Sequence, residues 1–407
     1  MRITRVRLFE LHGELDYDGE LWEERVVRPI DVYPEHKHER GYPIASGGVG
    51  QQRNARGAYP ISSIFVSVET DEGVSGLAGT IDRQTAFVID TDVAPLVVGE
   101  DPLAIERIWD KLYRQLIHAR KGQPMFAISA LDVALWDLKG KWLGQPVYRL
   151  LGGQVRDSIP AYASMLGYSL EPDRVTARAR EAVDAGFSAT KWFFRHGPDD
   201  GEPGARANVD LARTVREAVG DDVEVMLDAW NSWNARYAID MAHRMAEYRP
   251  RWIEEPVKPD DIPAYARIRA ASPVPIAGGE HEYTRWGTRD YMRAGAVDVF
   301  QPDTMWCGGI SETMKMATIC SVYDVPIVFH GSSVPVNVHL SAALPPTLCP
   351  YVEYLIKWND IRQLHLEHKV QPINGRIAPT TTPGLGLDID ESTVTNKREL
   401  SWRQAKP

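Results

Sequence analysis

Three acidic residues, Asp228, Glu254 and Glu280, end three short apolar runs at a constant interval of 26 residues (228 to 254 to 280). The runs are VEVMLDAW, RWIEEP and VPIAGGE, and a segment typical of a helix follows each of them. If each interval holds one strand and one helix, the strands are parallel and the three carboxylates meet at one end of a sheet. Carboxylates at such short separations repel one another unless a cation lies between them. Three oxygen ligands in an open site favour a hard divalent metal, so we predict one Mg²⁺ per subunit.

Four more ionisable residues, Lys191, Asp303, His330 and Glu353, fall at the ends of other predicted strands. A lone acidic residue after a strand is commonly a helix cap, and a lone histidine is commonly a packed or surface residue. Capping does not explain seven ionisable residues at corresponding points of consecutive repeats. We therefore expect an active site at this end of the sheet.

The types of these residues indicate a proton-transfer reaction. Asp303 and His330 lie on adjacent predicted strands, so the carboxylate could hold one imidazole nitrogen and raise the basicity of the other. Lys191 offers a fixed positive charge for a substrate carboxylate, and Glu353, if protonated, could donate to a developing oxyanion. Together with a metal, this set suits removal of the proton α to a carboxylate, which leaves an enediolate.

The elements that must position these residues form a repeat of alternating strands and helices. Such alternation indicates an α/β protein with a parallel sheet, and eight units over about 200 residues are what a (β/α)₈ TIM barrel needs. An open doubly wound sheet is the alternative, but it usually has fewer units and a Gly-rich first turn. The predicted strands are 159–164, 187–194, 224–230, 251–256, 274–280, 297–303, 326–332 and 351–355.

The repeat is flanked by segments of other character. Residues 1–15 and 60–80 alternate like strands, and residues 100–150 have helical periodicity. Residues 16–58 have no period, which is typical of a functional lid or of disorder. The tail from about residue 360 is rich in Pro and Gly, and we expect it to pack back on the N-terminal region.

Composition excludes several classes of function. The 407 residues carry a net charge of 46 − 56 = −10, which disfavours nucleic acid as a partner, and no basic run suggests a membrane surface. Neither a membrane-spanning run nor a signal-peptide core is present. Three widely spaced cysteines, Cys307, Cys320 and Cys349, fit neither a disulfide framework nor a Cys-x-x-Cys metal site. A cytoplasmic location is the default expectation.

Several motifs resemble those of the enolase superfamily in its mandelate racemase-like branch. They are AISALDVALWDLKGKWLGQPVYRLLGG (127–153), IEEP (253–256), GGE (278–280), QPD (301–303) and HGS (330–332). The resemblance implies a modified (β/α)₈ TIM barrel closed by an α+β capping domain. It also implies a division into a capping domain (1–125), a barrel (126–360) and a C-terminal segment packing on the cap (361–407).

One departure from the family pattern concerns the second barrel strand, where the family often has Lys-x-Lys with the second lysine as a base. Lys191 matches the first lysine, but Phe193 occupies the second position. A racemase needs bases on opposite faces of its substrate, and a hydrocarbon ring cannot take a proton. A single base, His330, could remove the α-proton and return it to a leaving β-hydroxide on the same face, which is a syn dehydration.

Within the branch, HGPDDGEPG (196–204), QPDTMWCGG (301–309) and PINGRI (372–377) most resemble the L-rhamnonate dehydratase family. That resemblance implies the metal ligands and the His–Asp dyad already derived, and a lid arginine that corresponds to Arg53 or Arg56. The lid histidine of that family has no clear counterpart here.

Two further residues are candidate substrate contacts. His281 directly follows a predicted metal ligand, and Arg195 lies just past the second barrel strand. A packing role for His281 and a solvent-exposed loop for Arg195 are the competing interpretations.

The leading hypothesis is a Mg²⁺-dependent acid-sugar dehydratase that converts an aldonate or aldarate to a 2-keto-3-deoxy sugar acid. One alternative is a racemase, epimerase or cycloisomerase of the same superfamily, with His281 or Arg195 as its second acid–base residue. The other is a non-catalytic sugar-acid-binding protein. The branch commonly forms octamers or dimers, so we expect a homo-oligomer.

Overall fold

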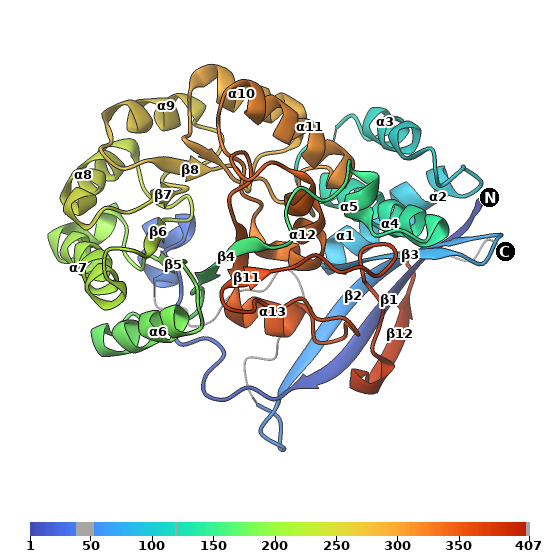
Figure 1. Ribbon diagram of the computed structural model, residues 1–407, viewed down its shortest axis with the longest axis horizontal. Helices are drawn as coiled ribbons and strands as arrows, with labels where there is room; N and C mark the ends of the chain where they lie inside the picture. Colours follow the sequence, from blue (N-terminus) through green and yellow to red (C-terminus); the bar gives the residue numbers. More distant parts are fainter. Residues whose placement is uncertain (38–52, 119, 404–407) are drawn as a thin grey trace.

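The computed structural model describes residues 1–37, 53–118 and 120–403, and Figure 1 shows a curled sheet ringed by helices beside a smaller antiparallel sheet. The larger sheet is parallel, with the strand order β10-β4-β5-β6-β7-β8-β9. Pairing of β10 with β4 makes the first and last strands of the repeat neighbours, which confirms the predicted α/β barrel. The strands are β4 (Ile159–Ser164), β5 (Ala189–Phe193), β6 (Glu224–Asp228), β7 (Trp252–Glu254), β8 (Ile276–Gly278), β9 (Val299–Phe300) and β10 (Val352–Leu355).

The seventh repeat differs from the predicted full strand over 326–332. Only Ile327 pairs there, in a single parallel bridge to Phe300, and the amide of Val328 donates to the Phe300 carbonyl. The neighbouring strand β9 is itself two residues long, because Pro302 soon follows and cannot donate to a ladder. The chain therefore leaves the sheet early and turns through His330 into the short helix η6 (Gly331–Ser333).

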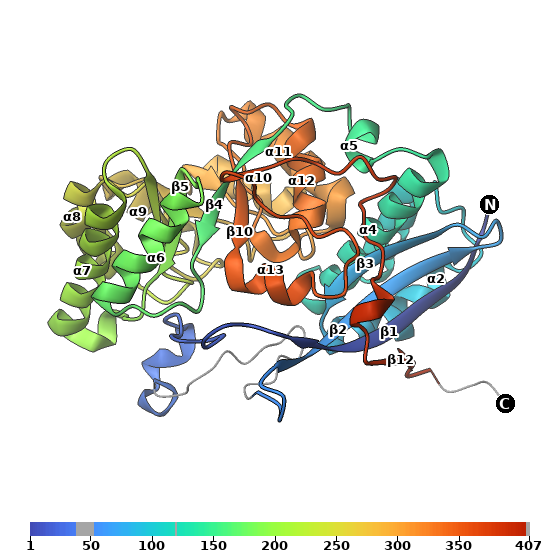
Figure 2. The same cartoon turned by 60° about the horizontal axis from the view of Figure 1, so that its bottom comes forward.

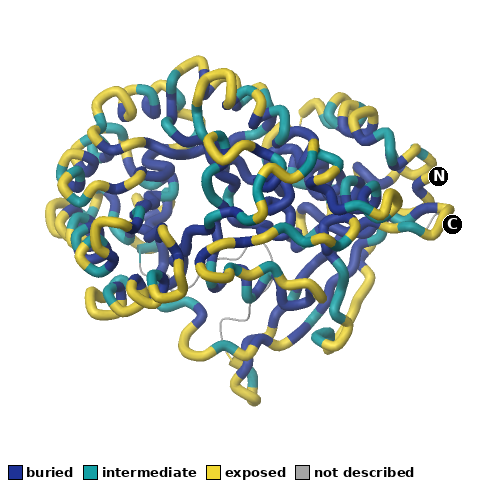
Figure 3. Tube along the Cα trace, in the orientation of Figure 1, coloured by how far each residue is buried: buried dark blue, intermediate teal, exposed yellow. Residues whose placement is uncertain are grey.

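Helices follow the strands and cover the outside of the barrel (Figure 1). Figure 3 shows the strands buried and the outward faces of these helices exposed. The helices are α6 (Pro172–Asp184), α7 (Gly201–Val219), α8 (Ala235–Met245), α9 (Ile262–Ala271), α10 (Thr284–Ala294), α11 (Gly309–Val322), α12 (Val334–Ala343) and α13 (Ile356–Arg362). None of the helices in the described part of the chain is long and apolar enough to cross a membrane.

Large apolar side chains fill the barrel interior below the polar strand ends. Tyr162, Met226, Trp252, Val299 and Val328 belong to one buried cluster contributed by alternate positions of the strands. The barrel is thus a packed core that closes one end and leaves the strand ends as the floor of a site.

The capping domain is an antiparallel sheet with the order β12-β1-β2-β3, covered by helices. The predicted return of the C-terminal tail is confirmed, because β12 pairs with β1 in a register that places Leu8 opposite Leu400. Its strands are β1 (Ile3–Leu15), β2 (Tyr59–Thr70), β3 (Ser75–Ile81) and β12 (Asn396–Leu400), and the helices between β3 and β4 are α1 (Arg83–Val88), η3 (Ile89–Val93), α2 (Ala94–Val97), α3 (Ile105–Gln115), α4 (Gln123–Leu143) and α5 (Val147–Leu150). The strand β11 (Arg376–Ile377) belongs to the larger sheet, where it pairs antiparallel with β4.

A buried carboxylate of the long helix α4, Asp137, joins that helix to the capping sheet and to the C-terminal segment. Its Oδ2 accepts from the Leu77 amide of β3 at 2.9 Å, and its Oδ1 accepts from the Leu385 amide of the C-terminal segment at 2.7 Å. Lys141, one turn further along α4, pairs with the same carboxylate at 2.9 Å and with Asp388 at 2.9 Å. One fully buried side chain thus connects three parts of the chain that are distant in sequence.

We predict that Asp137→Ala lowers the free energy of unfolding by about 3–5 kcal/mol, because it leaves two buried amides without acceptors and breaks a buried ion pair. The matched control is Asp388→Ala, which removes the other partner of Lys141. Asp388 is 39% exposed, so we expect a loss of about 0–1 kcal/mol. Urea denaturation followed by circular dichroism measures both, and equal losses would contradict the assigned role of Asp137.

Candidate active site

Six carboxylates gather at the carboxyl ends of the barrel strands, and each belongs to a residue at most 3% exposed. The parallel register produces this convergence, because it pairs Phe193 with Asp228 and Asp228 with Glu254 on neighbouring strands. Glu280 lies two residues beyond β8 and Glu353 lies within β10. The six are Asp228, Glu254, Glu255, Glu280, Asp303 and Glu353.

Lys191 is the cation at the centre of this group. Its Nζ lies 2.6 Å from Glu254 Oε1, 2.7 Å from Glu353 Oε1 and 3.2 Å from Asp228 Oδ2. Burial alone would lower the pKa of Lys191, but the charges of Glu254 and Glu353 raise it well above its ordinary value. The lysine is therefore charged and neutralises part of the carboxylate cluster.

The remaining negative charge is not balanced. Burial, followed by the charge of Glu254, raises the pKa of Asp228 well above its ordinary value. Burial raises the pKa of Glu280 to about 7, with Glu255 adding to the effect and His330 opposing it. Glu254 is better satisfied, because its Oε2 accepts from Trp252 Nε1 at 2.9 Å and from Gln301 Nε2 at 2.8 Å. Burial is the first cause of both shifts, and the six carboxylates outnumber the cationic groups beside them in the described structure, Lys191, His281 and His330.

This excess of carboxylate fits a divalent cation. The sequence predicts a first set, Asp228, Glu254 and Glu280, in which the strand register pairs Asp228 with Glu254. A second set, Glu255, Glu280 and His281, is the one whose donor atoms lie within 4.8 Å of one another among the described residues. In the second set Glu255 and His281 are already bonded to each other at 2.9 Å. The first set offers oxygen donors alone, which suit a hard cation such as Mg²⁺.

The predicted dyad is assembled. His330 Nδ1 lies 2.6 Å from Asp303 Oδ2, and Asp303 Oδ1 accepts from Ser332 Oγ at 2.8 Å and from the Met305 amide at 2.7 Å. Burial alone would lower the pKa of His330, but Glu280 and the bond to Asp303 raise it to about 10. With Nδ1 donating to the carboxylate, Nε2 is left for proton transfer, and it lies 3.7 Å from Glu280 Oε2.

A second histidine–carboxylate pair was not predicted. His281 Nδ1 lies 2.9 Å from Glu255 Oε1, and Asn231 Nδ2 donates to Glu255 Oε2 at 2.5 Å. Burial alone would lower the pKa of His281, but Glu255 raises it to about 9. Glu255 leaves strand geometry with φ = 42°, which is uncommon for a residue other than glycine, so two consecutive carboxylates are buried at the site. His281 thus has a defined partner, although no contact with a substrate follows from it.

Glu353 lies at the predicted place with a different bonding role from the one expected. Burial alone would raise its pKa, but the charges of Lys191 and His330 lower it below the ordinary value. Its Oε2 accepts from the Gly331 amide at 2.8 Å. Glu353 is therefore an ionised acceptor in this arrangement, whereas donation to an oxyanion would require its protonated form.

Phe193 occupies the position two residues after Lys191 on the same face of β5. Its ring centre lies 5.1 Å from the Lys191 Nζ, and the residue is 7% exposed. The side chain on this strand next to the cation is thus a hydrocarbon with no acid–base capacity.

A segment of the N-terminal region, residues 20–28, lies across the ends of β4 and β5, and we call it the strap (Figure 2). The Glu23 amide donates to the Gly167 carbonyl at 2.8 Å, and the Val27 amide donates to the Phe194 carbonyl at 2.8 Å. The fully buried Lys357 binds the strap through the Glu20 carbonyl at 3.2 Å and Glu23 Oε1 at 2.9 Å. The short helices η1 (Pro29–Val32) and η2 (Pro34–His36) follow it.

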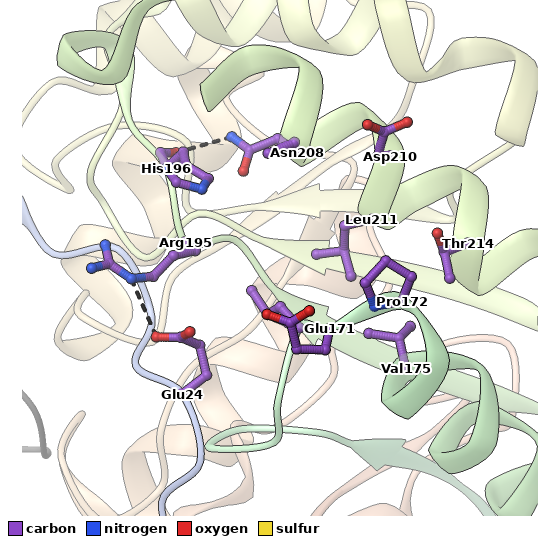
Figure 4. A pocket seen from close by; sticks show the side chains of 12 residues that line it. Glu24, Glu171, Pro172, Val175, Arg195, His196, Asn208, Asp210, Leu211 and Thr214 are labelled. Atoms are coloured by element: carbon purple, nitrogen blue, oxygen red, sulfur yellow. Dashed lines mark hydrogen bonds and ion pairs between the residues drawn. The ribbon is translucent and has the colours of Figure 1, made fainter. Parts of the chain in front are cut away.

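Arg195 also binds this N-terminal segment. Its Nε lies 3.2 Å from Glu24 Oε1, and its Nη2 donates to the Lys37 carbonyl at 2.7 Å. Arg195 and Glu24 line a pocket of about 300 Å³. Figure 4 shows them on one side of it, with His196 of the loop after β5, Glu171 before α6 and Asn208 of α7 also in its walls. None of the seven predicted catalytic and metal residues lines this pocket, so the contacts of Arg195 hold the strap rather than the carboxylate site.

The two predicted lid arginines, Arg53 and Arg56, bind groups other than the carboxylates at the strand ends. Arg53 donates to the carbonyls of Tyr17, Gly19 and Gly57. Arg56 is largely exposed and pairs with Glu14 at 3.6 Å. Residues 38–52, between the strap and Arg53, lie outside the described part of the chain.

Several site residues were missed by the sequence argument. Gln301 and Ser332 flank predicted residues by two positions, so the two-residue periodicity of extended chain could have indicated them. Asn231 and Trp306 come from loops, where no periodicity exists to place a side chain. Trp306 lies against both His281 and His330, with ring centres 5.8 Å and 5.1 Å apart.

The chain matches two family models and is similar to two named relatives along nearly its whole length. The model described as "Enolase C-terminal domain-like" matches residues 174–393, and the model described as "Mandelate racemase / muconate lactonizing enzyme, N-terminal domain" matches residues 54–152. L-rhamnonate dehydratase of Saccharopolyspora erythraea is 33% identical, with 96% of this chain and 97% of the relative covered. A putative L-rhamnonate dehydratase of Caldivirga maquilingensis is 34% identical, with 97% and 96% covered.

A solved structure is also similar to this one. It is rhamnonate dehydratase from Gibberella zeae complexed with Mg, with a TM-score of 0.80 and 28% identity over 96% of this chain and 95% of that chain.

We predict that Lys357→Met releases the strap, because Glu23 would keep a mostly buried carboxylate without its buried cation. Loss of such a partner costs about 2 kcal/mol or more, so amide exchange in residues 20–28 should be roughly 30-fold faster. Hydrogen-exchange mass spectrometry measures this. Arg174→Met is the matched control, since Arg174 pairs with the same Glu23 but is 64% exposed, and it should change exchange little. Equal exchange in Lys357→Met and the unchanged protein would contradict the assigned role.

Proposed function

This chain belongs to the mandelate racemase-like branch of the enolase superfamily, and from that premise we propose that it is a Mg²⁺-dependent acid-sugar dehydratase. Its substrate would be an aldonate or aldarate, and its product a 2-keto-3-deoxy sugar acid. L-rhamnonate and related aldonates are the first candidates, since two relatives carry that activity in their names.

In this proposal His330 does the acid–base work in its neutral form, which a cation bound to Glu280 would favour by countering the charge that raises the His330 pKa. Its Nε2 removes the proton from C2, and the electron pair of the C2–H bond passes to the substrate carboxylate, which becomes an enediolate. That pair then forms the C2–C3 double bond as the C3–O bond breaks, and the departing hydroxide takes the proton from His330 and leaves as water. The resulting enol rearranges to the 2-keto acid, so the net change is loss of one water. Asp303 keeps the imidazole in the required tautomer through its 2.6 Å bond.

The metal site of the proposal consists of Asp228, Glu254 and Glu280. The count of buried charges supports it, because six carboxylates face three cationic groups among the described residues, Lys191, His281 and His330. Mg²⁺, when bound, would supply positive charge to the substrate carboxylate as negative charge develops on its oxygens. Lys191 has three carboxylate partners, so its first task is to keep Glu254 and Glu353 ionised beside that cation.

The observation that carries dehydration over racemisation is Phe193. Along the sheet order β5 is four strands from β9, so it lies across the barrel from the loop that bears Trp306. His281 and His330 both contact that indole and both lie within 3.7 Å of the Glu280 carboxylate, so the two imidazoles share one side of the site. Phe193 on the opposite strand cannot take a proton, so β5 offers no counterpart of the family's second lysine on that face.

The proposal predicts that the protein dehydrates at least one member of an aldonate and aldarate library, detected as a 2-keto product. His330→Asn should lower kcat by about 100- to 10,000-fold, because proton transfer loses its base. His243→Asn, at an exposed histidine on α8, is the control and should leave kcat unchanged. Epimerised product or C2 exchange without dehydration would favour the racemase alternative, and tight binding without any turnover would favour a binding protein.

The proposed metal site predicts one Mg²⁺ per subunit by isothermal titration calorimetry. Glu254→Gln should abolish binding, whereas the adjacent and equally buried Glu255→Gln should weaken it far less. Binding should weaken as the pH falls below about 7, since Glu280, whose pKa is raised to about 7, must lose its proton to act as a ligand. Binding that survives Glu254→Gln but not Glu255→Gln would assign the ion to the set of Glu255, Glu280 and His281 instead.

A further inference from the structure

The loop after β9 presents Trp306 to the catalytic histidine. Asp303 shapes this loop as well as orienting His330, because its Oδ1 accepts from the Met305 amide and its carbonyl accepts from the Trp306 amide at 3.0 Å. The indole ring centre lies 5.1 Å from that of His330, at an interplanar angle of 40°. Asp303 thus positions the imidazole through its carboxylate and the loop that carries Trp306 through its carboxylate and its backbone carbonyl.

The indole is also packed against Phe126, in the first turn of α4. The two rings stack with centres 5.5 Å apart and an interplanar angle of 21°. Phe126 also stacks on Tyr283 at 6.1 Å and 17°. These separations are within the usual range for attractive aromatic pairs. Contacts with Phe126, His281 and His330 therefore restrict rotation of the indole.

The bond to Asp303 leaves one motion of His330 unrestrained. A hydrogen bond at Nδ1 fixes the direction of one ring edge, but the ring can still rock about that bond and move Nε2. Contact with the indole face opposes this rocking, and it removes the space in which water could approach the imidazole. His330 is correspondingly only 15% exposed in its side chain.

We propose that Trp306 is a positioning residue for the acid–base histidine, because it fixes the orientation of the His330 ring and excludes water from it. The proton taken from C2 is then delivered to the leaving hydroxide rather than exchanged with solvent. This inference rests on the proposed dehydration. Trp306, which is neither a metal ligand nor part of the His–Asp dyad, would thus control whether the abstracted proton is kept or exchanged.

The test compares Trp306→Ala, Trp306→Phe and Phe126→Ala in D₂O with an acid sugar that the unchanged protein dehydrates. Two quantities are measured: kcat and KM for dehydration, and deuterium at C2 of the recovered substrate. For Trp306→Ala we expect kcat to fall about 10- to 100-fold with little change in KM, since misplacing a reacting group by about 1 Å costs on the order of 100-fold. The ratio of C2 exchange to dehydration should rise about tenfold, because water reaches the imidazole.

The other variants separate positioning from packing. Trp306→Phe keeps an aromatic face on His330 and should restore most of kcat and the low exchange ratio. Phe126→Ala loosens the cap side of the indole but leaves His330 covered, so its exchange ratio should stay near that of the unchanged protein. Circular dichroism of each variant checks folding, and Trp142→Ala, at an exposed tryptophan of α4, controls for loss of a tryptophan as such.

An unaltered exchange ratio in folded Trp306→Ala, with dehydration still present in the unchanged protein, would overturn the inference and leave the proposed function intact. An equal rise in Phe126→Ala would also overturn it, because the effect would then come from packing of the cap. Absence of dehydration of any acid sugar by the unchanged protein would overturn the proposed function together with the inference that rests on it.

Discussion

Burial of six carboxylates at one end of the barrel is the constraint on which the rest of this structure depends. A buried carboxylate is costly unless it is paired, and like charges in a low-dielectric site add to that cost. Lys191 forms ion pairs with three of these carboxylates. Asp303 is bonded to His330, and Glu255 is bonded to His281. The six carboxylates still outnumber these three cationic groups, and this excess of negative charge is the physical basis for a cation site.

The surrounding architecture keeps this charge cluster out of water. Large apolar side chains such as Trp252 and Met226 fill the barrel beneath it. The strap covers the ends of β4 and β5, and the fully buried Lys357 holds that strap in place. The same low dielectric that makes unpaired charge costly strengthens the paired interactions, so a single geometry is favoured for Lys191 and for the His330–Asp303 dyad. Backbone strain is part of the arrangement, since Trp230, Asn231 and Glu255 all have positive φ at the strand ends.

Periodicity in the sequence predicted the barrel well and the loops poorly. The 26-residue spacing of acidic residues and the strand–helix alternation correctly predicted parallel strands β6, β7 and β8 and the convergence of their carboxylates. The predicted strand at 326–332 is reduced to one bridge, because its neighbour β9 is only two residues long. Arg195 illustrates the limit for loops: its position after β5 was predicted, but whether it faces the carboxylates or the strap depends on Glu24 and Lys37, which are more than 150 residues away in the chain.

The sequence by itself determined which residues stand at the strand ends and what acid–base chemistry they have, including the hydrocarbon Phe193 beside Lys191. These properties are local, because a parallel strand of regular pleat places alternate side chains on one face whatever surrounds it. Only the tertiary structure decided how the charges are shared: that Lys191 has three acidic partners, that Glu353 is an acceptor, and that Trp306 packs against Phe126 and His330. Such pairings join loops and helices that are far apart in the chain, and their distances follow from packing rather than from any repeat in the sequence.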